Sequence, residues 1–311
     1  MSSTRDEVAI IGGGIAGMAL ALALASHSIP STIYEMRPET PLPHHAGGGM
    51  MLCPNALRIL DGLDLYTPLL AQAYPFDYVY YKDRDEKTVD RYPMGGEAQF
   101  GYRAVRVFRQ ELVELLAATC RERGVRIEHR MRFVKVVAET ETGVEFEFEG
   151  GGRRSAGLLV GADGIHSKVR RAHVAPEAKL GYVGLAALTF AVPTAELRIP
   201  ADKGYEFPVS VASANGVFVL APQRPDGGEM LAGTQVPFDE AQAGRGREEL
   251  LADKEGLKAR LRRDEERWPG IEMEKLGRDE VWFEEGEGQM RWLYVPEIEQ
   301  RVEKWVKGKM E

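Results

Sequence analysis

The sequence has little cysteine. Only Cys53 and Cys120 occur among 311 residues, with no Cys-x-x-Cys pair and no Cys/His spacing of a metal site. The sequence therefore indicates neither a disulfide framework nor a zinc centre. Free thiols favour a reducing compartment, so we expect a cytoplasmic protein. His44 and His45 stand beside two prolines, and we interpret them as exposed loop residues rather than metal ligands.

Positive charge is also in short supply. The chain has 40 Lys and Arg against 48 Asp and Glu, a formal net charge of −8. A broad nucleic-acid surface needs clustered Lys and Arg in excess, so we expect no nucleic-acid partner. Hydrophobic residues make up 44% and charged residues 28%, which is typical of folded globular proteins. This composition favours a small-molecule partner.

Long hydrophobic runs are absent apart from residues 8–25, which are all apolar. A run of this length is near the lower limit for a membrane span. The three glycines at 12–14 would weaken a spanning helix, and Asp6 and Glu7 do not suit the start of a signal peptide. We therefore expect no membrane span and interpret the run as a buried strand, a turn and a helix.

The apolar run opens a β-α-β unit. Its pattern predicts a strand over 8–11, a tight turn over 12–14, a helix over 15–26 and a strand over 32–34. Helices are predicted over 54–60, 109–123 and 167–172, and strands over 125–128, 132–137, 144–148 and 158–160. Short strand-like runs such as 187–192 and 217–221 fill residues 182–282, with a charged helix over 248–263.

Three glycines stand where the first predicted strand meets its helix, in the spacing Gly12-x-Gly14-Ile15-Ala16-Gly17. In that context Gly12 permits the turn, Gly14 lets the backbone approach a pyrophosphate, and Gly17 lets helix and strand pack closely. The positive end of the helix, from Ile15 and Ala16 onward, then faces the phosphates. A glycine-rich turn without a ligand would show the same spacing.

Glu35 ends the second predicted strand and is followed by Met36 and Arg37. An acidic side chain at this place accepts hydrogen bonds from an adenosine ribose and repels a 2′-phosphate. Together with the glycines it predicts a nucleotide site that holds FAD or NAD rather than NADP. Met36 and Arg37 are candidate neighbours of the nucleotide, and Arg37 is equally consistent with a surface residue.

Three later stretches distinguish FAD from NAD. They are Gly47-Gly48-Gly49-Met50-Met51-Leu52-Cys53-Pro54-Asn55-Ala56-Leu57, Arg109-Gln110-Glu111-Leu112 and Gly161-Ala162-Asp163-Gly164-Ile165-His166-Ser167-Lys168-Val169-Arg170. With the glycine motif they resemble the FAD-dependent aromatic hydroxylases, which include salicylate and para-hydroxybenzoate hydroxylases and many fungal monooxygenases. An NAD-dependent dehydrogenase is disfavoured, because it would continue alternating strands and helices after Glu35.

The resemblance implies roles for individual residues. Glu35 would bind the adenosine ribose, Gly48 would line the flavin, and Arg109 would contact the FAD phosphates or ribityl chain. Asp163 would serve both FAD and reduced nicotinamide. It also implies an activity: an FAD-dependent monooxygenase in which NADH or NADPH reduces the flavin and a flavin hydroperoxide transfers one atom of O2. The substrate would be a small aromatic or polyketide-like molecule that is hydroxylated or epoxidised.

Arg109 also has a physical argument of its own. A cation in the first turn of a helix opposes the helix dipole unless an anion lies nearby, and a pyrophosphate would be that anion. An Arg that only extends into solvent is the alternative. No catalytic side chain can be assigned: Tyr182 and Tyr205 are candidates, and packing at a sheet edge explains both better.

The expected fold class is α/β, with mixed α+β character. A Rossmann-like FAD-binding domain over residues 1–180 would contain an inserted, mostly β substrate domain over 181–285. Residues 286–311 would return to the FAD domain.

The resemblance weakens at the C-terminus, where the family has a Gly-Asp motif that holds the ribityl chain. Residues 305–309 look like its lead-in, but no Gly-Asp dipeptide occurs in the sequence. Either the chain is a working monooxygenase in which a different solution or a homodimer supplies the missing part, or it is a truncated relative. A truncated relative would bind FAD weakly or act as a non-enzymatic binding protein.

Overall fold

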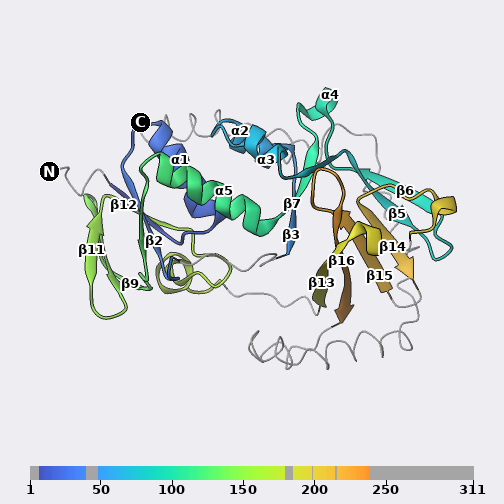
Figure 1. Cartoon of the computed structure of the whole chain (residues 1–311). Coiled ribbons are helices and arrows are strands. Elements are labelled where there is room, and N and C mark those ends of the chain that lie inside the picture. The colour runs from blue at the N-terminus through green and yellow to red at the C-terminus, as the bar shows by residue number, and fades with distance from the viewer. Residues whose placement is uncertain (1–6, 40–47, 179–184, 198, 214–215, 238–311) are drawn as a thin grey trace. The chain divides into compact units, whose positions relative to one another are not determined.

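The computed structural model describes residues 7–39, 48–178, 185–197, 199–213 and 216–237 (Figure 1). Two compact units divide the chain. The first unit comprises residues 1–47, 60–69 and 109–182, and the second comprises 48–59, 70–108 and 183–311. The chain therefore crosses between the units several times, so neither unit is one continuous segment.

The first unit is built on a four-stranded parallel sheet with the order β12-β1-β2-β8. Its strands are β1 (Val8–Ile11), β2 (Ser31–Glu35), β8 (Arg126–His129) and β12 (Leu158–Gly161). All four residues of β1 are buried, as expected for a central parallel strand with both faces covered. Helices α1 (Ile15–Ser26) and α5 (Arg109–Glu122) pack against each other (Figure 1). This sheet matches the predicted Rossmann-like order of elements.

A second, antiparallel sheet completes the first unit. Its strands, in the order β11-β10-β9, are β9 (Phe133–Thr140), β10 (Gly143–Phe148) and β11 (Arg153–Ala156). Along β10, buried residues alternate with partly exposed ones, which is the pattern of a sheet with one face in the core. Phe146 and Phe148 project from it against Tyr34, with ring centroids 5.8 and 5.0 Å from the tyrosine ring. This aromatic cluster joins the two sheets into one core.

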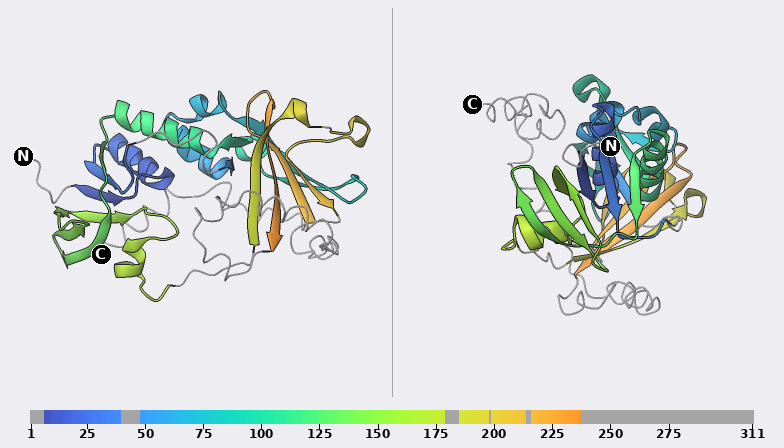
Figure 2. Two further views of the ribbon diagram at one scale, coloured as in Figure 1. Left: turned by 60° about the horizontal axis from the view of Figure 1, so that its bottom comes forward. Right: turned by 90° about the vertical axis from the view of Figure 1, so that its left-hand side faces the viewer.

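The second unit is mostly β, as Figure 2 shows in two further views. Its six-stranded sheet has the order β13-β16-β15-β14-β5-β6 and its three-stranded sheet the order β3-β7-β4. The strands are β3 (Gly49–Leu52), β4 (Tyr74–Phe76), β5 (Tyr78–Lys82), β6 (Thr88–Pro93), β7 (Ala104–Phe108), β13 (Leu185–Pro193), β14 (Val209–Ser213), β15 (Gly216–Pro222) and β16 (Glu229–Pro237).

The remaining helices of the two units are short. They are α2 (Pro54–Asp61), α3 (Tyr66–Leu70), α4 (Glu97–Phe100), a π-helical turn η2 (Arg170–Val174) and the 3₁₀ turns η3 (Thr194–Glu196) and η4 (Ala201–Lys203). No helix among the described residues is long and apolar enough to cross a membrane. The apolar run of residues 8–25 instead forms β1 and most of α1.

Two differences from the sequence predictions have physical causes. The helix predicted over 167–172 begins one residue later, at 168, because Ser167 Oγ accepts the amide hydrogen of Arg170 at 2.9 Å, and it continues as a π-helical turn over Arg170–Val174. Residues 48–59 and 70–108 were predicted within the FAD domain, yet they lie in the β-rich unit. Their strands pair with strands distant in sequence, such as β5 with β14. The helix predicted over 248–263 and residues 286–311 lie outside the described residues.

Candidate functional site

The glycine turn between β1 and α1 lies directly against the loop that follows β12. A Cβ atom on Gly12 would come within 2.5 Å of the carbonyl oxygen of Ala162, and the backbone of Gly12 has φ +111°. The Gly12 amide donates to Tyr34 O at 2.9 Å, and the Ala162 amide donates to Ile11 O at 2.8 Å. Only glycine satisfies both the conformation and the contact. The turn is therefore fixed by the strands on either side of it.

Gly14 and Gly17 differ in what surrounds them. A Cβ atom on Gly17 would come within 2.0 Å of Gly12 O, so this glycine is needed for the helix to pack on the turn. Nothing lies within 4 Å of a Cβ on Gly14, the N-cap of α1, and no side chain caps the helix. Ile15 is half-buried and Ala16 is exposed. The N-cap of α1 is therefore open on its Cβ side and is not capped by a side chain, which suits an anionic group.

Glu35 ends β2 beside this turn and is 7% exposed. Its Oε2 accepts the Gly13 amide at 2.7 Å, and its Oε1 accepts the amide and the Nε–H of Arg37, each at 2.9 Å. Burial alone would raise the pKa of the Glu35 carboxyl, but the hydrogen bonds from Arg37 and Gly13 outweigh it and lower the pKa. Glu35 is therefore an ionised acceptor at neutral pH, oriented by three donors.

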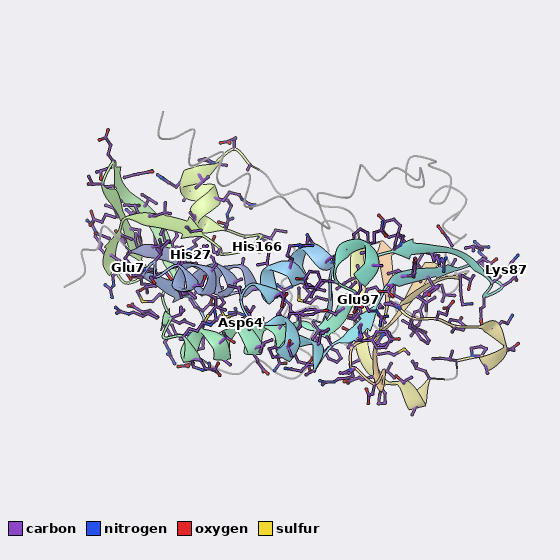
Figure 3. All side chains as sticks on the ribbon, turned by 90° about the horizontal axis from the view of Figure 1, so that it is seen from above. Glu7, His27, Asp64, Lys87, Glu97 and His166 are labelled. Carbon is purple, nitrogen blue, oxygen red and sulfur yellow. The ribbon has the colours of Figure 1, made fainter. Side chains whose placement is uncertain are left out.

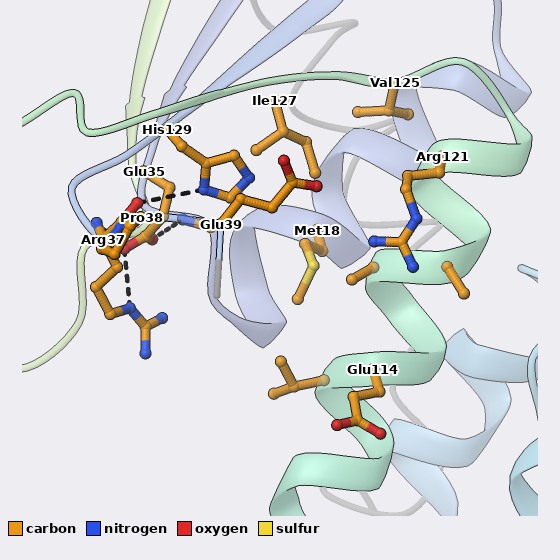
Figure 4. Close-up of a pocket in the computed structure, with 14 residues that line it drawn as sticks. Met18, Glu35, Arg37, Pro38, Glu39, Glu114, Arg121, Val125, Ile127 and His129 are labelled. Carbon is orange, nitrogen blue, oxygen red and sulfur yellow. Dashed lines mark hydrogen bonds and ion pairs between the residues drawn. The ribbon is translucent and has the colours of Figure 1, made fainter. Parts of the chain in front are cut away.

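A pocket of about 690 Å³ adjoins Glu35 within the first unit (Figure 4). Met36 is 53% exposed, whereas Arg37 contributes to the pocket wall. The lining residues come from the β1–α1 turn, α1, the end of β2, α5 and β8: Gly13, Met18, Glu35, Arg37, Pro38, Glu39, Val113, Glu114, Ala117, Ala118, Arg121, Val125, Ile127 and His129. The α5 and β8 residues were not predicted from the sequence. The small side chains of Ala117 and Ala118 on α5 are the signal that was available for them.

Asp163 lies in the loop that Gly12 contacts. Its Oδ2 accepts the amide hydrogens of Lys168 at 2.6 Å and of Val169 at 3.3 Å, while its Oδ1 is buried with no hydrogen-bond partner. The carboxylate therefore caps the next helical turn and keeps one unused acceptor. His166, labelled in Figure 3, is exposed, and its carbonyl accepts a hydrogen bond from Arg171. Asp163 and His166 form no acid–base pair.

The structure brings most of the predicted cofactor residues into the first unit. Gly12, Gly14, Ile15, Ala16, Gly17, Glu35, Met36, Arg37 and Asp163 belong to it, as does Arg109, the first residue of α5. Arg109 is exposed and forms no ion pair or side-chain hydrogen bond with the described part of the chain. Gly48, half-buried with φ +70°, belongs to the second unit.

Of the two tyrosine candidates, the structure describes only Tyr205. Tyr182, His44 and His45 lie outside the described residues. The Tyr205 ring stacks on Phe207 with centroids 6.1 Å apart, and Lys82 Nζ lies 4.6 Å from its centroid. Burial, followed by the charge of Glu86, raises the pKa of the Tyr205 hydroxyl to about 12. These contacts are those of a packed tyrosine. Across the described ranges no cluster of three or more His, Cys, Asp or Glu side chains suits a metal ion.

The residues of the first unit fit a flavin dinucleotide. The open face of Gly14 at the start of α1 accommodates a pyrophosphate, and the ionised Glu35 accommodates the hydroxyls of a ribose. The unused, buried Oδ1 of Asp163 is an acceptor for a further hydroxyl, such as those of a ribityl chain.

Comparisons with known proteins agree with this geometry. Residues 5–268 match the model of the FAD binding domain family. The chain is 32% identical over 173 residues to the FAD-dependent monooxygenase dpasE of Apiospora sacchari, covering 55% of this chain and 36% of that protein. It is 33% identical over 181 residues to the 3-amino-4-hydroxybenzoate 2-monooxygenase PtmB3 of Streptomyces platensis, covering 55% of this chain and 42% of that protein.

A solved structure shares the fold. HpxO of Klebsiella pneumoniae, complexed with FAD and uric acid, is 20% identical with a TM-score of 0.60, over 75% of this chain and 57% of that one. The chain spans only 36% and 42% of the length of the two curated relatives named above. The family match nevertheless covers most of the chain. The chain therefore belongs to the FAD binding domain family of FAD-dependent, aromatic-hydroxylase-type proteins.

Proposed function

We propose that this chain carries out FAD-dependent monooxygenation of a small aromatic or polyketide-like molecule, which it hydroxylates or epoxidises with O2 and NADH or NADPH. The proposal depends chiefly on the open face of Gly14 at the start of α1, beside an ionised Glu35. The names of the two sequence relatives, both monooxygenases, support the reaction class. The 3-amino-4-hydroxybenzoate in one of those names supports an aromatic substrate.

Residues of the first unit would hold the FAD. The amides of Gly14, Ile15 and Ala16 would donate to the pyrophosphate, because they are the free donors at the positive end of α1. Glu35 would accept hydrogen bonds from the adenosine ribose, and the pocket beside it would take the adenine ring. In this arrangement Arg37, which is ion-paired with Glu35 at the pocket wall, would limit access of water to the ribose.

Three further residues would complete the cofactor site. Asp163 Oδ1 would accept a hydrogen bond from a hydroxyl of the flavin side chain. This oxygen is buried without a partner, which costs free energy, and such a hydrogen bond would recover it. Arg109, a cation at the start of α5 with no ion pair among the described residues, would face a phosphate or the ribityl chain. Gly48, with its left-handed backbone and no side chain, would border the flavin ring.

When bound, the flavin supplies the redox chemistry with NADH or NADPH and O2. The chain's contribution is to orient the cofactor, to recognise the substrate and to exclude water. The second unit, with its broad sheet, would select the substrate. The alternative is a relative that binds FAD weakly and has no turnover.

Glycine variants test the cofactor site in the full 311-residue chain. Gly14→Ala adds a methyl group where the pyrophosphate would approach, and Gly152→Ala adds one where nothing lies within 4 Å and no positive φ is required. Both variants are expected to fold. We expect Gly14→Ala alone to weaken FAD binding, by about tenfold or more, in a titration followed by visible absorption. Equal affinities would contradict this placement of the pyrophosphate.

Turnover is measured on the same samples. Substrate-stimulated oxidation of NADH or NADPH by the FAD-loaded chain in air would support the monooxygenase. Tight FAD binding without any oxidation would leave the chain as a flavin-binding protein. A chain that takes up no FAD would contradict the proposal as a whole.

A further inference from the structure

The second unit holds an arginine in the middle of a sheet with no acidic partner. Arg106 is the central residue of β7, which lies between β3 and β4. The residues directly opposite it are Met51 on β3 and Tyr74 on β4. Residues directly opposite on neighbouring strands project from the same face. The guanidinium is therefore flanked by a thioether and a phenol, neither of which neutralises its charge.

The environment of Arg106 disfavours its charge. Its Nε is buried without a hydrogen-bond partner, and the guanidinium forms no ion pair with the described residues. Burial lowers the pKa of Arg106 to about 10, with no opposing charge to restore it. The side chain still carries its proton at neutral pH. Arg106 as a whole is only partly buried, so its Nη groups stay accessible to a ligand. A buried donor nitrogen without an acceptor costs free energy in a folded protein, so the buried Nε points to a partner other than the described residues.

Two other arginines of the same unit have carboxylate partners. Arg103 Nε lies 3.0 Å from Asp77 Oδ1, and Arg224 Nε lies 3.3 Å from Glu229 Oε2. Arg224 also lies over the Phe108 ring, with its Cζ 5.3 Å from the centroid. Arg103 and Arg224 thus each have a carboxylate, whereas Arg106 has none among the described residues.

A second unsatisfied group lies beside Arg106. Gln223 is fully buried, and its Nε2 donates to Ala221 O at 2.8 Å. Its Oε1 has no partner. Rotating the amide by 180° would bring Oε1 against the Ala221 carbonyl, where two acceptors repel, so the orientation is fixed. Gln223 therefore presents a buried acceptor that awaits a donor.

Both groups converge at Gly49 of β3. A Cβ atom on Gly49 would lie 2.3 Å from Gln223 Oε1 and 3.0 Å from Arg106 Nη2. Because Gly49 has no side chain, the Gln223 amide and the Arg106 guanidinium can both approach its Cα. The result is a cationic donor, partly buried, beside a fully buried neutral acceptor.

We propose that Arg106 and Gln223 form an anion-recognition subsite for a small carboxylate or enolate that carries an N–H or O–H donor beside the charged oxygen. The guanidinium would donate to the anion, and Gln223 Oε1 would accept from the adjacent donor. As a substrate subsite this inference rests on the proposed function, since the anion would belong to the molecule that is oxidised. As a binding site it involves residues of the second unit only, so it does not depend on FAD binding.

The test is calorimetric titration of the full chain, with and without FAD, with three probes. 2-Aminobenzoate has both the charge and the adjacent donor, benzoate has only the charge, and 2-aminobenzamide has no charge. We expect the affinities to fall in that order. Arg106→Met should lower the affinity for 2-aminobenzoate by about tenfold or more. Arg84→Met, which removes an equal charge from an exposed turn, should leave it unchanged.

Gln223→Leu sharpens the assignment. It should remove the preference for 2-aminobenzoate over benzoate while leaving benzoate binding, because Arg106 remains. Thermal unfolding supplies a second readout: Arg106→Met should melt at the same temperature as the parent chain or higher, since it removes a buried donor nitrogen that has no acceptor.

Several outcomes would overturn the subsite. They are no binding of any probe, equal binding of all three, an Arg84→Met loss as large as that of Arg106→Met, or a lowered melting temperature for Arg106→Met. Failure of the proposed function looks different, because probe binding would persist in a chain that neither takes up FAD nor oxidises NADH or NADPH.

Discussion

Glu35 in the first unit is a buried charged side chain at the end of a strand, and Arg106 in the second is a partly buried one in the middle of a strand, yet their surroundings are opposite. Glu35 receives three hydrogen bonds from Gly13 and Arg37, and its pKa is lowered. Arg106 has a buried Nε without a partner, and burial lowers its pKa to about 10. Glu35 is thus stabilised in its charged form before any ligand arrives, whereas Arg106 is not.

This difference indicates two kinds of binding site. The first unit has an orienting framework in which the backbone and a neighbouring arginine fix the carboxylate, as suits a cofactor that is held in one position. The second unit leaves a cation and an amide acceptor unsatisfied, as suits a ligand that supplies the missing partner. The free energy of an unsatisfied group is recovered only when that ligand binds.

The largest effect is expected from overfilling the glycine turn of the first unit. Gly17→Val places a branched side chain where even a Cβ would lie 2.0 Å from Gly12 O, so the turn and α1 must separate. We expect a loss of about 3 kcal/mol or more in the free energy of unfolding, measured in urea, and no FAD binding. Gly152→Val is the control, because nothing lies within 4 Å of its Cβ. A Gly17→Val chain of parental stability would show that the turn is not tightly packed.

Lys82 allows a comparison with Arg106 within the second unit. It is 1% exposed, and its Nζ donates to the carbonyls of Glu86 at 2.9 Å and Lys203 at 2.7 Å. Lys82→Met should cost about 2 kcal/mol in the free energy of unfolding, because it leaves two carbonyls unsatisfied, whereas Arg106→Met should cost nothing. Equal costs for the two variants would remove the distinction between a satisfied and an unsatisfied buried cation.

The stabilisation from Glu35 should depend on pH. Its pKa in the folded chain lies below the unfolded value of 4.5, so its contribution is fully present above pH 4.5 and is lost as the pH falls through the folded pKa. Glu35→Gln should therefore lower the melting temperature at pH 7 and make the stability less dependent on pH below about 4.5. We expect an effect of about 1 kcal/mol at pH 7. Parallel melting curves across pH 3 to 7 would contradict the hydrogen-bond assignment.

The smallest effect is expected at the surface of the first unit. His173 Nε2 lies 2.6 Å from Glu139 Oε2, and both side chains are substantially exposed. Solvent screens such a pair, so His173→Ala should change the free energy of unfolding by less than about 0.5 kcal/mol in the same urea assay. A larger loss would mean that the burial of a charged side chain does not predict its contribution to the free energy of unfolding in this protein.

The first unit was largely predictable from sequence because its signals are local. An apolar run interrupted by glycines predicts β1 and α1, and Gly124, with φ +69°, follows α5 as the expected helix stop. The spacing of Glu35 from the glycines predicts that they meet. The family match confirms the predicted family, and the likeness to a solved structure confirms the predicted fold. The roles assigned to the individual residues stay predictions.

The second unit was much less predictable because its pairings are distant. The strands β4, β5, β6 and β7 are short, and β5 pairs with β14, which lies more than a hundred residues later. Arg106 lacks an acidic partner because the residues opposite it on the neighbouring strands are Met51 and Tyr74. The sequence near Arg106 does not predict which residues these are. The pocket beside Glu35 likewise requires α5 and β8 to lie next to the end of β2. Domain boundaries at residues 180 and 285 stay predictions for the same reason.

The most direct test of the nucleotide site is competition between FAD and two adenine nucleotides, followed by flavin fluorescence. AMP should displace FAD from the full chain, because it contains the adenosine and the 5′-phosphate that Glu35 and the glycine turn would bind, and it differs from 2′,5′-ADP only by the 2′-phosphate. The 2′-phosphate of 2′,5′-ADP should be repelled by the Glu35 carboxylate, so this nucleotide should compete at least about tenfold more weakly, and Glu35→Gln should narrow that gap. Equal competition by the two nucleotides, or none by either, would contradict the assignment of this site.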